Sequence, residues 1–248
     1  MAERQVKSRA RVADHGEVFT AQREVNAMLD LVKQETERID SRFLEPACGD
    51  GNFLAEILRR KLAAVKARYK KSPADFEKYA VVAATSIYGV DILQDNVDAC
   101  RARLFDIWDG AYTENCKGDC REDCREAVRY ILARNILCGN ALTMRRVDAG
   151  GNDTEEPIVF SEWNMVTGSL LKRRDYRLDA LMGEVNSPNS EQLSMFDPAG
   201  GAAPKDLLRG ADSLQLDPET KAWIPKPLRE YPLVAYWRVQ ESELEQLS

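Results

Sequence analysis

Hydrophobic positions follow a helical or a strand pattern in turn over the first two thirds of the chain. Apolar residues at helical spacing predict four helices, over residues 18–32, 52–69, 94–108 and 122–133. Thr20 is the predicted N-cap of the first helix. Short apolar runs between these segments predict strands: "RFLEP" at 42–46, "VVAATSIYGVDI" at 81–92, "NILCGNAL" at 135–142 and "EPIVFSEW" at 156–163.

Strands and helices in this order predict an α/β fold, with a parallel sheet and crossover helices. The pattern stops after Trp163. Residues 183–218 are rich in Gly, Pro, Ser, Asn, Asp and Ala, which predicts a flexible linker. The tail contains "YPLVAYWRV", which predicts a late strand that docks on the sheet. We therefore expect a domain over 1–182, a linker over 183–218 and a docked C-terminal segment over 219–248.

Composition is that of an ordinary globular protein, with 44% hydrophobic and 31% charged residues in a chain of 248. No run of 18 apolar residues and no signal-peptide pattern is present, so we expect a cytoplasmic protein without a membrane partner. The net charge of −6 argues against a surface coated with basic residues. Three basic clusters are candidates for phosphate contacts or simply solvated surface: residues 4–11, 59–71 and 171–177.

The stretch "LEPACGDGNFL" follows the first predicted strand, where an open α/β sheet binds its ligands. Gly49 and Gly51 allow the backbone to bend and to approach a ligand closely. The helix that follows directs its first N–H groups into the loop. Neither G-x-G-x-x-G nor a P-loop lysine is present, which argues against a dinucleotide or a nucleoside triphosphate. Glu45 and Asp50 would repel phosphates and suit a cationic ligand.

"FLEPACGDGNFL" resembles the first motif of S-adenosylmethionine-dependent methyltransferases, in the version found in adenine-N6 DNA methylases of restriction-modification systems. The resemblance implies a Rossmann-like methyltransferase sheet, here shortened in its C-terminal half, and S-adenosyl-L-methionine as the cofactor. It extends over about residues 12–163. "HGEVFTAQREVNAMLDLV", "IYGVDI" and "ILCGNAL" resemble the upstream, second-strand and third-strand motifs of the same family.

The resemblance also implies roles for individual residues. Asp91 would accept hydrogen bonds from the two ribose hydroxyls, a suitable task for a carboxylate. Phe19 and Thr20 would lie over the methionine part, although the family usually has Pro where this chain has Ala21. The cofactor-binding residues expected in this way are Phe19, Thr20, Glu45, Pro46, Cys48, Gly49, Gly51, Asp91, Ile92, Asn140 and Ala141.

The family's chemistry lies on a fourth strand that ends in Asp, Asn or Ser followed by two prolines and an aromatic residue. This sequence has no Pro-Pro pair and reads "VFSEWNMV" at the corresponding place. In one interpretation Ser161 or Asn164 holds the target amino group and Trp163 stacks on a flipped base. In the other, the site has decayed.

Partners are expected on two grounds. Little chain follows Trp163, so a separate target-recognition subunit would read the DNA sequence. "QLSMF" resembles the pentapeptide with which bacterial DNA-handling proteins dock on the sliding clamp, and its anchors would be Gln192, Leu193, Met195 and Phe196. Docking of this pentapeptide on the protein's own surface is the alternative.

Three cysteines, Cys116, Cys120 and Cys124, are spaced four residues apart and are predicted to lie along one helical face. Together with Cys138 they would offer four thiolates. Evenly spaced ligands on a single helix do not wrap a tetrahedral ion easily, so we expect reduced cysteines and no metal.

The sequence thus predicts an S-adenosylmethionine-dependent methyltransferase that methylates DNA at adenine N6, in a restriction-modification or mobile-element context. A catalytically inactive cofactor-binding or DNA-associated subunit is the alternative. A small-molecule or protein methyltransferase fits the acidic net charge but not the family of the motifs.

Overall fold

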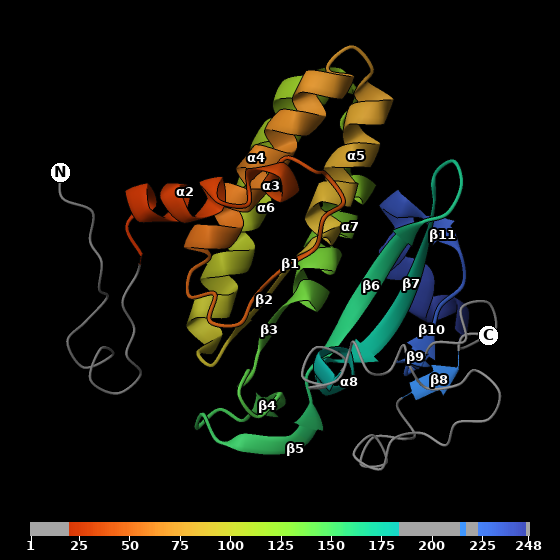
Figure 1. The fold of residues 1–248 in the computed structure, drawn as a ribbon. Helices are drawn as coiled ribbons and strands as arrows, with labels where there is room; N and C mark the ends of the chain where they lie inside the picture. The colour runs from red at the N-terminus through yellow and green to blue at the C-terminus, as the bar shows by residue number, and fades with distance from the viewer. Residues whose placement is uncertain (1–19, 184–213, 217–222, 247–248) are drawn as a thin grey trace, which may run out of the picture.

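A computed structural model describes residues 20–183, 214–216 and 223–246. Within these residues the chain is a mixed α/β structure built around a three-stranded parallel sheet (Figure 1). The strand order is β1 (Phe43–Glu45), β2 (Ile87–Asp91), β3 (Ile136–Cys138), with β2 in the middle. Three of the four predicted strands therefore form the expected parallel arrangement.

Two helices connect each strand of this sheet to the next, and all four pack together on one face of it (Figure 1). Their apolar faces and the facing side chains of the sheet form the main core. The helices of this part of the chain, including the two before β1, are α2 (Gln22–Asp30), α3 (Lys33–Thr36), α4 (Asn52–Tyr69), α5 (Pro73–Thr85), α6 (Gln94–Cys116), η1 (Lys117–Asp119) and α7 (Glu122–Asn135).

Helix α5 corrects the prediction of a strand over residues 81–92, because β2 begins only at Ile87. Ser72 is the N-cap, its side chain accepts a hydrogen bond from the Asp75 N–H, and Pro73 occupies the first turn. These start signals extend a helix through the run of valines and alanines that resembled a strand.

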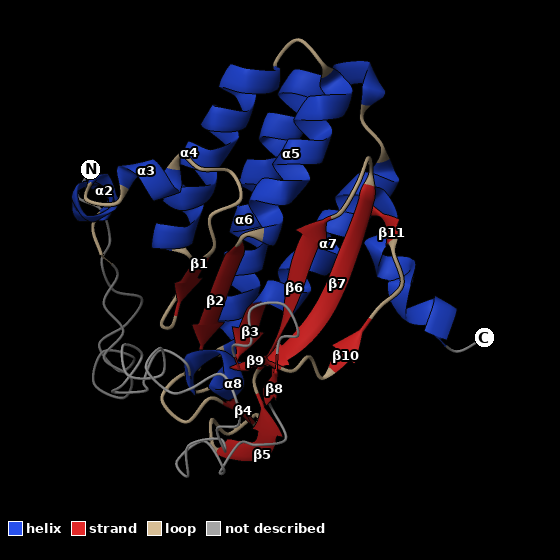
Figure 2. Ribbon diagram, turned by 45° about the vertical axis from the view of Figure 1, so that its right-hand side comes forward, coloured by secondary structure: helices blue, strands red, loops and turns tan. Residues whose placement is uncertain are grey.

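The predicted fourth strand does not join the parallel sheet. It becomes β6 (Val159–Met165), which pairs antiparallel with β7 (Leu170–Arg177). β7 pairs in turn with β10 (Arg229–Glu230) and β11 (Val234–Ala235), so a separate antiparallel sheet lies beside the parallel one (Figure 2). A second apolar cluster, which includes Tyr88 and Phe160, joins this sheet to the second face of the parallel sheet.

The C-terminal segment packs on the antiparallel sheet and on α7. β11 pairs with β7, and η4 (Tyr236–Gln246) packs against α7. Of the predicted linker, residues 214–216 form a strand and Gly183 ends a helix, whereas the remainder, with the pentapeptide at 192–196, lies outside the described residues. The remaining elements are β4 (Arg145–Val147), β5 (Asp153–Pro157), α8 (Leu178–Gly183), β8 (Leu214–Leu216) and β9 (Trp223–Pro225).

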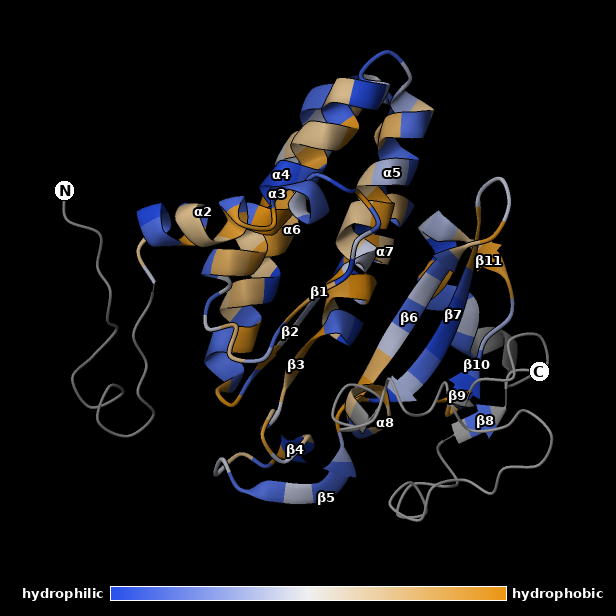
Figure 3. Ribbon diagram, in the orientation of Figure 1, coloured by the Kyte–Doolittle hydropathy of each residue, from blue (hydrophilic) through white to orange (hydrophobic). Residues whose placement is uncertain are grey.

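The helices and some of the strands differ in hydropathy. Figure 3 shows hydrophobic and hydrophilic residues alternating along the helices, whereas β4, β5 and β7 are mostly hydrophilic. Among the described residues, no helix combines the length and the apolar character that crossing a membrane requires.

Candidate cofactor-binding site

The glycine loop, residues 46–51, connects the carboxyl end of β1 to the first turn of α4. Gly49 and Gly51 have φ values of 54° and 90°, in the left-handed region that favours glycine. A Cβ on Gly51 would also lie 2.7 Å from the Cys100 Sγ on α6. Gly51 is the N-cap of α4 and no side chain caps the helix, so the first N–H groups of α4 face the loop without a side-chain acceptor.

Asp91, at the carboxyl end of β2, ties this loop to the start of α6. Its Oδ2 accepts a hydrogen bond from the Gly49 N–H at 2.9 Å. Its Oδ1 accepts from the Leu93 N–H at 2.9 Å and from the Asn96 side chain at 3.2 Å. A carboxylate oxygen has two lone pairs, so Oδ2 can accept a further donor, such as a ligand hydroxyl.

The acidic residues of the loop differ in their surroundings. Asp50 pairs with Arg103 of α6 at 3.3 Å, and the same guanidinium donates to the Asn52 side chain at 2.6 Å. Arg103 therefore anchors the loop and compensates the charge of Asp50. Glu45 is different: burial raises its pKa, so a nearby cation would stabilise its ionised form.

Sequence reasoning missed Arg103, because arginines on a helix are common and its contacts depend on the packing of α6 against the loop. The segment before α2 also reaches the loop, since the Asn52 side chain donates to the Thr20 carbonyl at 3.3 Å. Thr20 is not the helix N-cap as predicted: Ala21 occupies that position and forms no side-chain cap. Phe19 lies outside the described residues.

Cys48 is buried within the loop and packs against the middle of β2. A Cβ on Gly89 would lie 3.0 Å from the Cys48 Sγ, so glycine there lets the loop sit close to the sheet. A hydrogen bond with Cys100 and burial both raise the pKa of Cys48, which keeps its thiol neutral. Pro46 is exposed, and Ile92, half-buried, follows β2 directly.

The residues that follow β3 complete the carboxyl-terminal side of the sheet. The Gly139 N–H donates to the Asp91 carbonyl at 2.9 Å, which holds the start of the β3 loop beside β2. The Asn140 side chain donates to Asp153 at 3.1 Å and accepts from the Leu142 N–H at 3.0 Å. Ala141 packs against the second apolar cluster.

The expected cofactor residues from 45 to 141 thus gather at the carboxyl ends of the three strands, because the strands are parallel and end on the same side of the sheet. This region offers the carboxylates of Glu45 and Asp91, the N-terminus of α4 without a side-chain cap, and glycines that allow a ligand to approach the backbone closely. Such a set can bind a ligand that carries hydroxyls and a positive charge.

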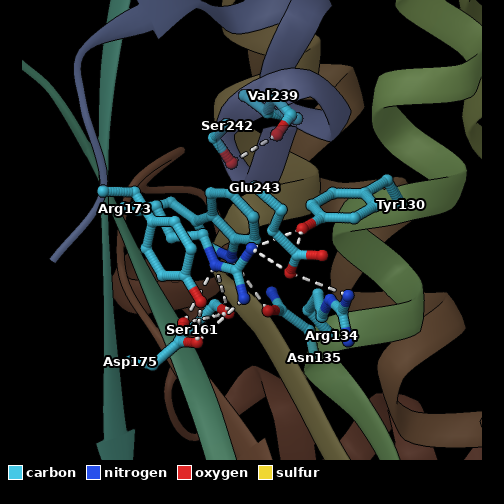
Figure 4. Close-up of polar contacts among 11 residues, drawn as sticks. Tyr130, Arg134, Asn135, Ser161, Arg173, Asp175, Val239, Ser242 and Glu243 are labelled. Carbon is cyan, nitrogen blue, oxygen red and sulfur yellow. Dashed lines mark hydrogen bonds and ion pairs between the residues drawn. The ribbon is translucent and has the colours of Figure 1, made fainter. Parts of the chain in front are cut away.

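Ser161 belongs instead to a buried polar network around Arg173, shown in Figure 4. Trp163 packs against the Arg173 guanidinium. The Ser161 Oγ donates to the Asp175 Oδ1 at 2.7 Å and accepts from the Arg173 Nε at 3.0 Å. Arg173 also forms ion pairs with Asp175 at 2.8 Å and with Glu243 of η4 at 2.9 Å. We call these four residues the Arg173 network; it joins β6, β7 and η4.

Trp163 is buried, and its Nε1 donates to the Asn135 side chain at 2.9 Å. Asn164 accepts a hydrogen bond from Arg42 at 3.1 Å. Arg42 precedes β1, whereas the glycine loop follows it, so "SEWN" reaches the amino end of β1. The structure therefore does not bring Ser161, Trp163 and Asn164 together with the loop, and their catalytic role stays a prediction.

The prediction that the evenly spaced cysteines lie along one helix is wrong. Cys116 ends α6, Cys120 follows η1 and Cys124 lies in α7. Burial raises the pKa of Cys116 to about 12 and also raises that of Cys124. Within the described part of the chain, no group of three or more His, Cys, Asp or Glu side chains is arranged to hold a metal ion.

Comparisons with protein-family models, with curated proteins and with solved structures gave no match to this chain.

Proposed function

We propose that the chain is an S-adenosylmethionine-dependent methyltransferase that acts on DNA at adenine N6, in a restriction-modification or mobile-element context. The hydrogen bond from the Gly49 N–H to the Asp91 carboxylate is the observation that carries this proposal. It joins the two motifs with the most specific roles, the glycine loop and the acid after the second strand. In this proposal the parallel sheet is a shortened Rossmann-like methyltransferase sheet.

The chemistry of the site fits S-adenosyl-L-methionine. Asp91 would accept the ribose hydroxyls, and the desolvated Glu45 would face the positive charge of the ligand. The uncapped N-terminus of α4 suits the ligand's carboxylate. The cofactor supplies the methyl group when bound; the residues of this chain bind and orient it.

A catalytically inactive cofactor-binding subunit is the second candidate. The observation in its favour is that Ser161 and Trp163 already hydrogen-bond to Asp175 and Asn135 in the folded chain. Side chains held in this way would have to leave buried partners before they could contact a base, and buried polar groups without partners are costly.

Transfer of a radiolabelled methyl group to unmethylated bacterial DNA, followed by identification of the methylated base, distinguishes the two candidates. Labelled N6-methyladenine with the purified chain supports the enzyme. Cofactor binding without transfer supports the inactive subunit or a missing partner. Label only on protein or on small molecules would contradict a DNA substrate. Binding to DNA, to a target-recognition subunit and to the sliding clamp are further proposals that the same preparation can test.

A further inference from the structure

Strand β1 has an edge that no described strand covers. The Phe43 N–H donates to the Ser86 carbonyl, so the backbones of Phe43 and Glu45 are directed toward β2. The N–H and carbonyl of Leu44, between them, are directed toward the opposite edge. Among the described residues, β1 pairs with β2 alone.

Two hollows flank this edge, and Phe43 and Leu44 line both. The smaller, of about 230 Å³, is bounded by α2 and α4 and opens on the face of the main core. The larger, of about 370 Å³, is bounded by Tyr88, Phe160 and α8 and opens on the other face of the sheet. Because side chains alternate between the two faces of a strand, a strand added along β1 would place successive side chains in one hollow and then the other.

The charge of the two hollows defines what fits them. Glu45 is the one charged residue among those that line the smaller hollow. The larger has Arg42 and Glu162, which pair with each other at 2.8 Å. Apolar side chains are exposed beside β1, with Leu44 40% and Val32 45% exposed. An uncharged, apolar strand is therefore the complementary occupant.

We propose that an apolar β-strand of a second polypeptide adds to β1 at Leu44, and that its carboxyl end lies beside the glycine loop. The direction of the strand rests on the proposed function: the polar and aromatic residues that β6 does not bring to the loop would come from the partner chain. The edge and its two hollows do not depend on that function.

The test uses the full chain and a fluorescent synthetic peptide of alternating valine and isoleucine that ends in Asn-Pro-Pro-Tyr. Fluorescence anisotropy measures binding. Methylation of the backbone nitrogens at alternate positions gives two peptides that differ only in which edge keeps its N–H groups. We expect one of them to bind about tenfold more weakly and the other to bind as the parent does. No binding, or equal loss with both peptides, overturns the proposal.

Val32→Glu and Leu31→Glu form a matched pair on the protein. Val32 lines the smaller hollow, whereas Leu31 is 86% exposed and lines neither hollow. We expect Val32→Glu to weaken peptide binding about tenfold, because it places a charge in the hollow, and Leu31→Glu to leave it unchanged. Equal effects of the two substitutions would contradict docking at β1.

Two other occupants predict different results. If residues 184–213 of this chain cover β1, the peptide binds only after a glycine-serine linker of the same length replaces them. If a second copy covers β1, sedimentation shows a dimer that Val32→Glu dissociates. Either result overturns the proposal.

Calorimetry with S-adenosyl-L-methionine separates this test from the proposed function. Peptide binding without cofactor binding supports the strand site and contradicts the proposed function. Cofactor binding without peptide binding supports the proposed function and contradicts the strand site.

Discussion

Lys61 shows how a single residue positions the strand that leads into the site. It lies within the basic cluster at residues 59–71, yet its side chain is fully buried. Its Nζ donates to three carbonyls in the segment before β1, those of Arg38 at 2.8 Å, Ile39 at 3.1 Å and Ser41 at 2.6 Å. Burial lowers the pKa of Lys61 to about 8. At this position the cluster is therefore a structural contact and not a phosphate-binding surface.

Replacing Lys61 by methionine should destabilise the fold by about 2–4 kcal/mol, because it leaves buried carbonyls without donors. Urea denaturation measures the change. Lys66→Met on the same helix is the control, since Lys66 is exposed and pairs with Glu114 at the surface. Similar losses for the two variants would contradict this role for Lys61.

Glu77 of α5 is buried and accepts four hydrogen bonds, two from Arg121 and one each from Tyr112 and Tyr236. Burial raises its pKa, but these hydrogen bonds outweigh burial and hold the pKa below its usual value of 4.5. The native state therefore binds this proton less readily than the unfolded chain does. The resulting stabilisation is present above pH 4.5 and is lost as the pH falls through the lower, folded-state pKa.

We expect Glu77→Gln to lower stability at neutral pH and to make the acid branch of the stability curve less steep below pH 4.5. Thermal unfolding between pH 7 and 3 tests both effects. Glu126→Gln, at an exposed position on α7, should follow the wild-type curve. An acid branch of unchanged steepness in Glu77→Gln would show that Glu77 does not control acid unfolding.

At the scale of elements, the Arg173 network holds the β6–β7 hairpin on η4. Arg173→Met should destabilise the protein by about 3–5 kcal/mol, because it leaves the carboxylate of Asp175 without its cation and that of Glu243 with Arg134 alone. Arg174→Met is the matched control, since the next side chain along β7 is 37% exposed. Denaturant melts of the two variants give the comparison, and equal stability would contradict a structural role for the network.

Local patterns predicted the elements that depend on them. α4 spans Asn52–Tyr69, as its apolar spacing indicates, and β1 lies within "RFLEP". α5 was missed because its apolar run resembles a strand, although "SPAD" carries the capping residues of a helix start. The placement of β6 depends on pairing with β7, a contact between segments that periodicity alone does not reveal.

The candidate site was predictable to a similar degree. The positions of Gly49, Gly51 and Asp91 follow from strand order, since parallel strands end at one edge. The contacts of Arg103 and the burial of Ser161 depend on packing between distant segments. Successive side chains of β7 point to opposite faces of the sheet, so Arg173 is buried on the same face as Leu171, whereas Lys172 and Arg174 lie on the other face. This period of two is the sequence signal that places Arg173 inside.

At the scale of the whole molecule, the parallel sheet has its four connecting helices on one face, and the antiparallel sheet beside it packs against α5 and α7. A second apolar cluster joins the two sheets on the other face. β1 is left as an edge strand, with the glycine loop at its carboxyl end and a hollow on each side. This arrangement separates the proposed cofactor site from "SEWN" and leaves room for a further strand next to the loop. We therefore expect the chain to bind the cofactor by itself, whether or not a partner strand occupies β1.

Isothermal titration calorimetry of the purified chain with S-adenosyl-L-methionine tests the central claim most directly. We expect one molecule bound per chain, with Asp91→Ala weakening binding by about 1–3 kcal/mol because the carboxylate no longer accepts the ribose hydroxyls. Asp98→Ala, at an exposed carboxylate on α6, should bind as the wild type does. No binding by the wild type, or equal binding by Asp91→Ala and Asp98→Ala, would contradict the account.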